Sequence, residues 1–175
     1  MPNTTNINNQ INTMRRLLIR WSHAAIELAI SSDAPVHTDR SIKDGFSVRT
    51  NLDNKCRQSK GGIERGRGFV DYALMAAMNE QQNDGTYLYS ENSSLPNYMQ
   101  DIYTTIEIYT ACLAAHETAH ACIFYQDNIE KRPDSPDHGP RWQVLNAYLR
   151  KALVKRGIEL LVQNSEKSGT SPSQS

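Results

Sequence analysis

Three side chains that could bind a metal ion and move a proton stand together in the segment 111–126, ACLAAHETAHACIFYQ. His116, Glu117 and His120 follow the order H-E-x-x-H inside this otherwise apolar run. On a helix, residues four apart project from one face, about one turn apart along the axis. Imidazole nitrogens bind Zn²⁺ at ~2.0–2.1 Å. The spacing therefore predicts that both histidines hold one zinc ion.

Glu117 is the candidate catalytic residue of this segment. It follows His116 directly, so it projects about 100° further around the helix and can stand beside the metal rather than on it. A carboxylate in that place can accept a proton from a water that the metal activates. Short motifs also arise by chance. The apolar flanks nevertheless favour a metal site, because partly buried imidazoles need polar partners.

A catalytic zinc usually takes three protein ligands and leaves one position open for water. The extended pattern H-E-x-x-H-x-x-G-x-x-H does not apply, because positions 123 and 126 are Ile and Gln. His138 is the best candidate for the third ligand. It ends a turn-rich loop, QDNIEKRPDSPD, that can return the chain to the metal helix, and the Gly-Pro after it can begin another helix.

Other candidate ligands stay open at this point. Glu159 is the one glutamate of the following helix that is well placed in the sequence, and Glu130 comes soon after the metal helix. Cys112 stands one helical turn before the motif, although a small buried core residue is its ordinary interpretation. His23 and His37 lack ligand spacing, so we interpret them as structural or surface residues.

Hydrophobic spacing indicates the helices that must position these residues. Apolar residues recur at helical intervals over about 12–30, over about 99–125 and from Pro140 onward. The predicted buried stripe of the last helix consists of Trp142, Leu145, Leu149, Leu153 and Leu160. Residues 1–11 are expected to be frayed and residues 164–175 to form a disordered tail, since both segments are polar.

Residues 45–92 have the composition of short strands. GFSVRTNLD, RGFVDYALM and TYLYSE are rich in Val, Tyr, Phe and Thr, while KCRQSKGGIERG and NEQQNDG carry turn residues. These runs predict a small antiparallel sheet of about three strands. ALMAAMNEQQ could continue as a helix instead. Together with the helices they predict an α+β fold, and the length predicts one domain over residues 12–163.

Composition argues against several classes of protein. Lys plus Arg and Asp plus Glu number 19 each among the 175 residues, so the net charge indicates no partner. Three cysteines without a C-x-x-C pair argue against a disulfide framework and against a zinc ribbon. The sequence has no signal-peptide pattern and no apolar run of membrane-spanning length. We expect a soluble, cytoplasmic protein without a membrane partner.

Two segments, AAHETAHA and HGPRWQVLNAYLRKAL, resemble the SprT-like (Spartan-type) zinc metallopeptidases. That family has an H-E-x-x-H helix and a third histidine in an H-G-x-x-aromatic motif that opens the next helix. The matching residues here are His116, Glu117, His120, His138, Gly139 and Trp142. The resemblance implies a zincin-like fold with an N-terminal helix, a small antiparallel sheet, the metal helix, a loop and a C-terminal helix. It also implies one bound Zn²⁺.

The similarity is specific over residues 111–150 and loose over the rest of 12–160. The sequence departs from many members of the family because it lacks the cysteines of their zinc ribbon.

From these residues we expect a zinc-dependent metalloendopeptidase that hydrolyses peptide bonds in protein substrates. Glu117 would be its general base, and an exposed edge of the sheet, TYLYSE, would bind the substrate as an added strand. A tyrosine or arginine could help to stabilise the oxyanion. The sequence offers four candidates and does not choose among Tyr103, Tyr109, Arg141 and Tyr148.

The alternative is a nucleic-acid-associated protein whose zinc site is structural or weakly active. Residues 40–70 hold eight basic and three acidic side chains. With Phe46 and Phe69 interleaved, this region could follow a phosphate backbone. The basic residues are Arg40, Lys43, Arg49, Lys55, Arg57, Lys60, Arg65 and Arg67. An inactive scaffold is a third possibility, against which the intact Glu117 argues.

Overall fold

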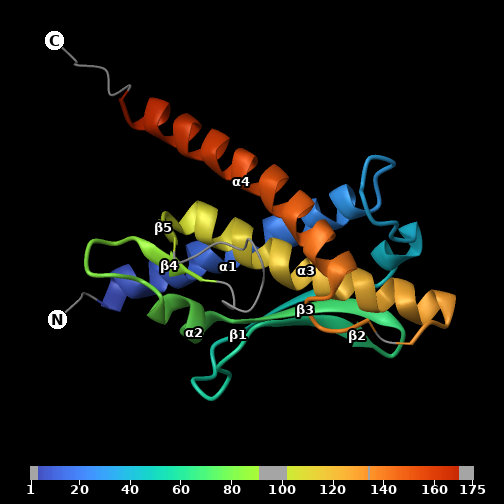
Figure 1. The fold of residues 1–175 in the computed structure, drawn as a ribbon. Helices are drawn as coiled ribbons and strands as arrows, with labels where there is room; N and C mark the ends of the chain where they lie inside the picture. Colours follow the sequence, from blue (N-terminus) through green and yellow to red (C-terminus); the bar gives the residue numbers. More distant parts are fainter. Residues whose placement is uncertain (1–3, 91–101, 134, 170–175) are drawn as a thin grey trace, which may run out of the picture.

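Helix α3 (Ile106–Glu130) lies between a small sheet and helix α4 (Pro140–Gly169), as Figure 1 shows. A computed structural model describes residues 4–90, 102–133 and 135–169 of the chain. Helix α1 (Thr4–Ala29) packs against both α3 and α4. The predicted α+β class is confirmed, because the described residues combine long helices with short strands.

Small side chains allow α3 to pack on several sides at once. Its buried residues include five alanines, namely Ala111, Ala114, Ala115, Ala119 and Ala121. Because alanine adds only a methyl group beyond the backbone, the neighbouring layers can approach the helix closely. The helix begins at Ile106 rather than near residue 99, since residues 102–104 form a strand. Residues 99–101 lie outside the described part of the chain.

The core joins the three long helices and the sheet. α1 contributes Met14, Leu18 and Trp21, and β3 contributes Val70 and Tyr72. From α4 come four of the five residues predicted as its buried stripe, which are Trp142, Leu145, Leu149 and Leu153. Leu160, the fifth, is only partly buried. The helical spacing of apolar residues therefore identified the buried face of α4 correctly.

The main sheet is mixed rather than antiparallel as predicted. It contains β1 (Ser47–Asn51), β2 (Lys60–Glu64) and β3 (Arg67–Ala73) in the order β1-β3-β2. β2 and β3 form an antiparallel hairpin, whereas β1 pairs with β3 in parallel. The loop after β1 carries the chain past the position of β3 to the far edge. When the hairpin returns, β3 fills the gap and runs parallel to β1.

The sequence of β2 and of the hairpin turn after it does not have the composition of a strand. Arg65 and Gly66 have φ of 51° and 74°, the positive values that a two-residue type I′ turn requires. The composition of KCRQSKGGIERG predicts a turn, but five of its residues, 60–64, form β2. Two adjacent glycines in so short a strand remove most of the compositional signal.

The third predicted strand belongs to a separate sheet. β4 (Tyr87–Tyr89) pairs in antiparallel fashion with β5 (Ile102–Thr104). Residues 74–79 form helix α2 (Leu74–Asn79), so the helical alternative for ALMAAMNEQQ is the one observed. A 3-10 turn, η1 (Arg40–Lys43), follows the loop after α1 and is capped by Asp39, which accepts a hydrogen bond from the Ser41 N–H at 2.8 Å.

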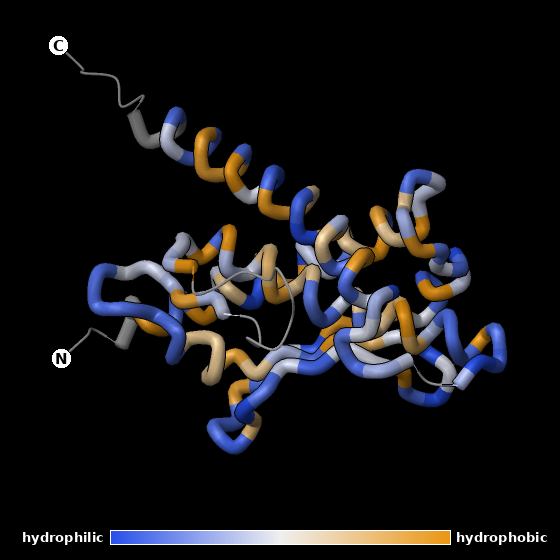
Figure 2. The backbone as a smooth tube through the Cα atoms, viewed as in Figure 1, coloured by the Kyte–Doolittle hydropathy of each residue, from blue (hydrophilic) through white to orange (hydrophobic). Residues whose placement is uncertain are grey.

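Both ends of the chain are more helical than expected. α1 begins at Thr4, within the segment predicted to be frayed, and α4 continues to Gly169, within the predicted tail. Residues 170–175 lie outside the described part. The last turns of α4 extend beyond the rest of the fold, and polar and apolar positions alternate along them (Figure 2). Among the described helices, none has the combination of length and apolar character that crossing a membrane requires.

Candidate metal centre

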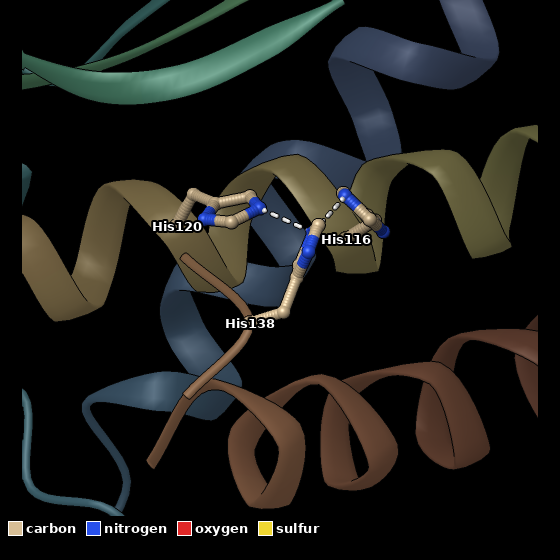
Figure 3. Close-up of side chains that lie close together, drawn as sticks. All are labelled: His116, His120 and His138. Atoms are coloured by element: carbon tan, nitrogen blue, oxygen red, sulfur yellow. Dashed lines mark hydrogen bonds between the residues drawn. The ribbon is translucent and has the colours of Figure 1, made fainter. Parts of the chain in front are cut away.

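Three imidazoles from two chain segments converge beside α3 (Figure 3). His116 and His120 project from one face of that helix, one turn apart, as the spacing predicts. His138 approaches them from the loop that precedes α4. The ligand atoms of the three residues lie within 4.8 Å of one another, so the group could hold a metal ion.

The two distances from the ring nitrogen of His138 to those of His120 and His116 fit a tetrahedral site. The Nε2 atom of His138 lies 3.2 Å from Nε2 of His120 and 3.3 Å from Nε2 of His116. Two nitrogens that bind one tetrahedral zinc at ~2.0–2.1 Å lie about 3.3 Å apart. A single ring nitrogen carries either one proton or one lone pair, so hydrogen bonding alone cannot satisfy both contacts of His138. A cation that accepts all three lone pairs can.

The electrostatic environment keeps His120 in the form that binds metals. Burial lowers its pKa to about 3, and the neighbouring imidazoles of His116 and His138 lower it in the same direction. A neutral imidazole has a free lone pair, whereas an imidazolium ion has none. His120 is therefore neutral, and able to coordinate, at any pH at which the protein would ordinarily be studied.

Backbone geometry positions His138. Its φ of 57° lies in the left-handed region, which histidine adopts more readily than most residues. The Gln143 side chain donates a hydrogen bond to the His138 carbonyl at 2.8 Å, and the Gly139 N–H donates to the Pro136 carbonyl at 2.9 Å. These bonds hold the loop at the start of α4, so the imidazole points back toward α3.

Asp127 anchors the same loop to α3. Its side chain is almost fully buried, forms an ion pair with Arg141 and accepts a hydrogen bond from the Ser135 N–H at 3.0 Å. Burial raises the pKa of the Asp127 carboxyl, but the hydrogen bonds from Ser135 and Arg141 outweigh that effect and hold the pKa below its usual range. The charged carboxylate thus ties the chain to α3 on both sides of His138.

Trp142 packs against all three imidazoles. Its ring centroid lies 4.8 Å from that of His116, 5.0 Å from that of His120 and 4.3 Å from that of His138. The indole N–H donates a hydrogen bond to the His116 carbonyl at 3.3 Å. This buried ring fixes the first turn of α4 on α3 and walls one side of the site.

Glu117 lies beside the histidines and is buried. Only 6 % of the residue is exposed. Burial raises the pKa of its carboxyl, against the charge of His116 and a hydrogen bond from the Gly61 backbone, which both lower it. A raised pKa brings a carboxyl closer to the neutral range in which a general base and acid must exchange protons.

Gly61 allows β2 to lie directly on α3 next to Glu117. A Cβ atom at position 61 would lie 1.7 Å from the Glu117 carbonyl oxygen, so only glycine fits there. No local pattern in the sequence marks Gly61 as a site residue. The pair Gly61-Gly62 is its only trace in the sequence, because the contact joins positions 56 residues apart.

A cleft of about 560 Å³ opens over the three histidines. Its walls come from residues 57–61 on one side and from α3 on the other, and Glu117 also lines it. At one end it reaches α2, with Ala76, Ala77 and Glu80. At the other end it reaches Phe124 and Asp137. The candidate ligands and the candidate base therefore share one open space.

We compared the chain with known proteins. No protein-family model, curated protein or solved structure matches it.

The structure separates the remaining candidate ligands from the site. Among the described residues, the group of converging ligand atoms contains neither Glu159 nor Cys112 nor Glu130. Glu159 is exposed on α4, Cys112 is buried in the core, and Glu130 pairs with Arg132. His23 and His37 are exposed surface residues, in agreement with their interpretation.

Only one of the four candidates for oxyanion stabilisation lines the cleft. This residue is Tyr109, which is 5 % exposed and whose pKa is raised by burial. Tyr103 is exposed to solvent on β5, and Arg141 forms an ion pair with Asp127. The hydroxyl of Tyr148 lies 3.4 Å from the Ser31 hydroxyl. The cleft lining therefore leaves Tyr109 as the candidate, although burial of its hydroxyl limits its reach.

The basic run divides between two faces of the sheet. Arg57 lines the cleft, and Arg49, Arg65 and Arg67 line a hollow on the opposite face. Lys60 borders both, because it lines the cleft and its ammonium lies 5.9 Å from the centroid of the Phe69 ring. Phe69 lies in that hollow, with the Arg49 guanidinium 4.6 Å from its ring centroid.

Phe46 is different, because it is partly buried and packs against the core and against His23. Only one of the two aromatic residues is therefore available on the basic face.

Proposed function

We propose that this protein is a zinc-dependent metalloendopeptidase with a zincin-like active site, as the resemblance to SprT-like peptidases implies. One observation carries the proposal. Three converging imidazoles face an open cleft, with the Nε2 atom of His138 3.2 and 3.3 Å from those of His120 and His116, and a buried carboxylate stands next to them in that cleft. A purely structural zinc site is usually closed by four protein ligands and needs no neighbouring base.

His116, His120 and His138 would hold one zinc ion, and Glu117 would transfer protons. The ion would act as a Lewis acid that polarises a water molecule and the substrate carbonyl. A Glu117 carboxylate oxygen accepts a proton from the attacking water and then delivers it to the amine that leaves. In the metal-free protein burial raises the pKa of Glu117, and a carboxyl that protonates readily can hold the proton between the two steps.

The substrate would be an extended protein segment that pairs with β2. β3 occupies one edge of β2, and residues 57–61 turn their other side toward the cleft. Addition of a strand at such an edge supplies backbone hydrogen bonds without requiring a particular sequence. The segment TYLYSE, first considered for this role, is less suitable. β4 pairs with β5 on one edge, and Leu88 and Tyr87 contact Glu80 and Gln81 on the other.

Metal content and proteolysis test the proposal together. The purified chain should bind about one zinc per molecule, by the single-site argument, and His138→Ala should lose most of it. The zinc-loaded protein should cleave an unfolded protein such as reduced casein. Glu117→Gln should keep the zinc and lose at least ~100-fold in rate, since general base catalysis contributes that much. Zinc binding without any cleavage by the wild type would contradict the peptidase and favour an inactive scaffold.

The hollow around Phe69 favours nucleic-acid binding as a second candidate function. An aromatic ring flanked by Arg49 at 4.6 Å and Lys60 at 5.9 Å on the open face of a sheet can stack a base and neutralise phosphates. Binding of fluorescent single-stranded DNA should weaken steeply with salt and be lost in Phe69→Ala. Unchanged binding in that variant would contradict this site, whatever the outcome of the protease assay.

A further inference from the structure

The cleft extends further from the histidines on one side than on the other. Toward the C-terminal half of α3 it is lined by Phe124 and Asp137. Toward α2 it is longer and includes Ala76, Ala77 and Leu113. This longer half of the described cleft is the part that the metal site does not use.

Small and apolar residues shape the longer half. Leu113 stands on the cleft face of α3, three residues before His116, and Tyr109 stands one turn earlier. Opposite them, α2 presents Ala76 and Ala77, whose methyl groups occupy little of the available space. A larger apolar side chain of a bound peptide could therefore occupy the volume that the alanines leave.

The spacing of this half matches an extended peptide. Leu113 lies about 4.5 Å before His116 along the helix axis, at 1.5 Å per residue. One residue of an extended strand advances about 3.3 Å. The peptide side chain next to the scissile bond would thus contact Leu113 and Ala76. A side chain further along the peptide would lie near Tyr109.

The direction of β2 determines which side of the scissile bond is bound there. β2 starts near α2, because Lys60 pairs with Asp71 and the Ala73 N–H donates a hydrogen bond to the Ser59 hydroxyl at 3.2 Å. A peptide that pairs with β2 in the antiparallel direction, the more stable one, runs toward α2. Its residues after the scissile bond therefore enter the longer half.

We propose that Ala76, Ala77 and Leu113 form a subsite for a large apolar side chain directly after the scissile bond. This inference rests on the proposed peptidase function. It names the substrate class as unfolded segments that carry leucine, methionine or phenylalanine at that position, with Ala76 setting the size limit.

Peptide cleavage by the zinc-loaded full chain tests the subsite. The probes are fluorogenic peptides of glycine and serine with one variable residue, leucine or alanine. The wild type should cleave the leucine peptide on the amino side of leucine, at least ~10-fold faster than the alanine peptide. Ala76→Leu should abolish or reverse this preference. Asn79→Leu adds the same side chain on the exposed end of α2, outside the cleft, and should leave the preference unchanged.

A binding measurement separates failure of the subsite from failure of the peptidase. If the wild type cleaves neither peptide, the peptidase proposal fails, and binding of the labelled peptides to zinc-loaded Glu117→Gln decides the subsite alone. Tighter binding of the leucine peptide, lost when Ala76→Leu is added, supports the subsite. Equal binding of the two peptides overturns it, as does cleavage by the wild type without preference for leucine.

Discussion

Glu117 meets two opposing requirements at the scale of a single residue. Its place beside the histidines suits proton transfer, but burial makes its charged form unfavourable. Because the folded protein binds the Glu117 proton more tightly than the unfolded chain does, the contribution of this carboxyl to stability is largest at low pH. It is lost as the pH rises through the raised pKa.

Replacement of Glu117 should therefore stabilise the metal-free protein at neutral pH. Glu117→Gln keeps an oxygen that can accept the hydrogen bond from the Gly61 backbone but removes the buried charge. We expect a higher free energy of unfolding than in the wild type at pH 7, and a smaller difference at pH 4, where the unfolded chain also begins to bind the proton. Urea unfolding at both pH values measures the two differences. An equal gain at both would show that the charge is not responsible.

The sequence predicts those site residues whose positions depend only on local geometry. The spacing of His116 and His120 on a helix requires no tertiary information. His138 could be predicted because the loop before it is short and the Gly-Pro after it begins a helix. Gly61 and Asp127 could not be predicted, since their roles depend on contacts with other elements. In the sequence, Gly61 resembles an ordinary turn glycine, and Asp127 resembles an aspartate on the surface of a helix.

At the scale of elements, the contact of β2 with α3 determines the position of the candidate base. Gly61→Ala would place a methyl group 1.7 Å from the Glu117 carbonyl oxygen, so β2 must move away. We expect a loss of about 1–3 kcal/mol in the free energy of unfolding, as for overpacked sites, together with reduced proteolysis.

The adjacent glycine provides the control. At Gly62 an added Cβ would lie 3.4 Å from the Phe69 ring, an ordinary contact. Gly62→Ala should change stability by less than about 1 kcal/mol, since alanine is the better strand residue. Equal effects of the two substitutions would show that the contact with α3 does not limit β2.

The loop that carries His138 depends on Asp127. Asp127→Asn preserves the shape of the side chain but weakens the bonds to Arg141 and Ser135. We expect zinc affinity to fall by about 10-fold or more, as for other residues that support metal ligands. Competition with a chelating dye measures it.

Glu130→Gln is the matched control for this prediction. Glu130 is an acidic residue near the end of the same helix, and its partners are Gln126 on that helix and Arg132, which is about half exposed. We expect unchanged zinc affinity, because Glu130 bonds to neither Ser135 nor Arg141, the two residues through which Asp127 holds the chain on both sides of His138. If Asp127→Asn bound zinc like the wild type, the loop would be held by its other bonds alone.

The elements themselves were predictable to different degrees. α3 and α4 have long apolar patterns at helical spacing, which local sequence is sufficient to reveal. The order and direction of the strands are not local properties. β1 and β3 pair in parallel across 15 intervening residues, from Leu52 to Gly66, that contain β2 itself. No short-range pattern indicates which edge of the sheet the chain will take.

At the scale of the whole molecule, the stability of α4 is uneven along its length. Leu153 is fully buried, whereas Val162 is 53 % exposed and the residues after it are exposed as far as Glu166. We expect Leu153→Ala to cost about 2–5 kcal/mol. A chain that ends after Gln163 should lose less than about 0.5 kcal/mol, as for other surface changes.

Thermal or urea unfolding of the two variants measures this contrast. A large loss on truncation would mean that the projecting turns of α4 make contacts that the described residues do not show.

The division of the candidate ligands between α3 and the loop has a mechanical consequence. His120 and His138 are 18 positions apart, so a zinc ion bound to both would act as a clasp that closes this stretch into a ring. A cross-link over a loop of that size reduces the freedom of an unfolded chain by an amount worth about 3 kcal/mol. Unlike a disulfide, this clasp opens when a chelator removes the ion. Hydrogen exchange at the Ser135 and Gly139 amides would then report whether the ion is in place.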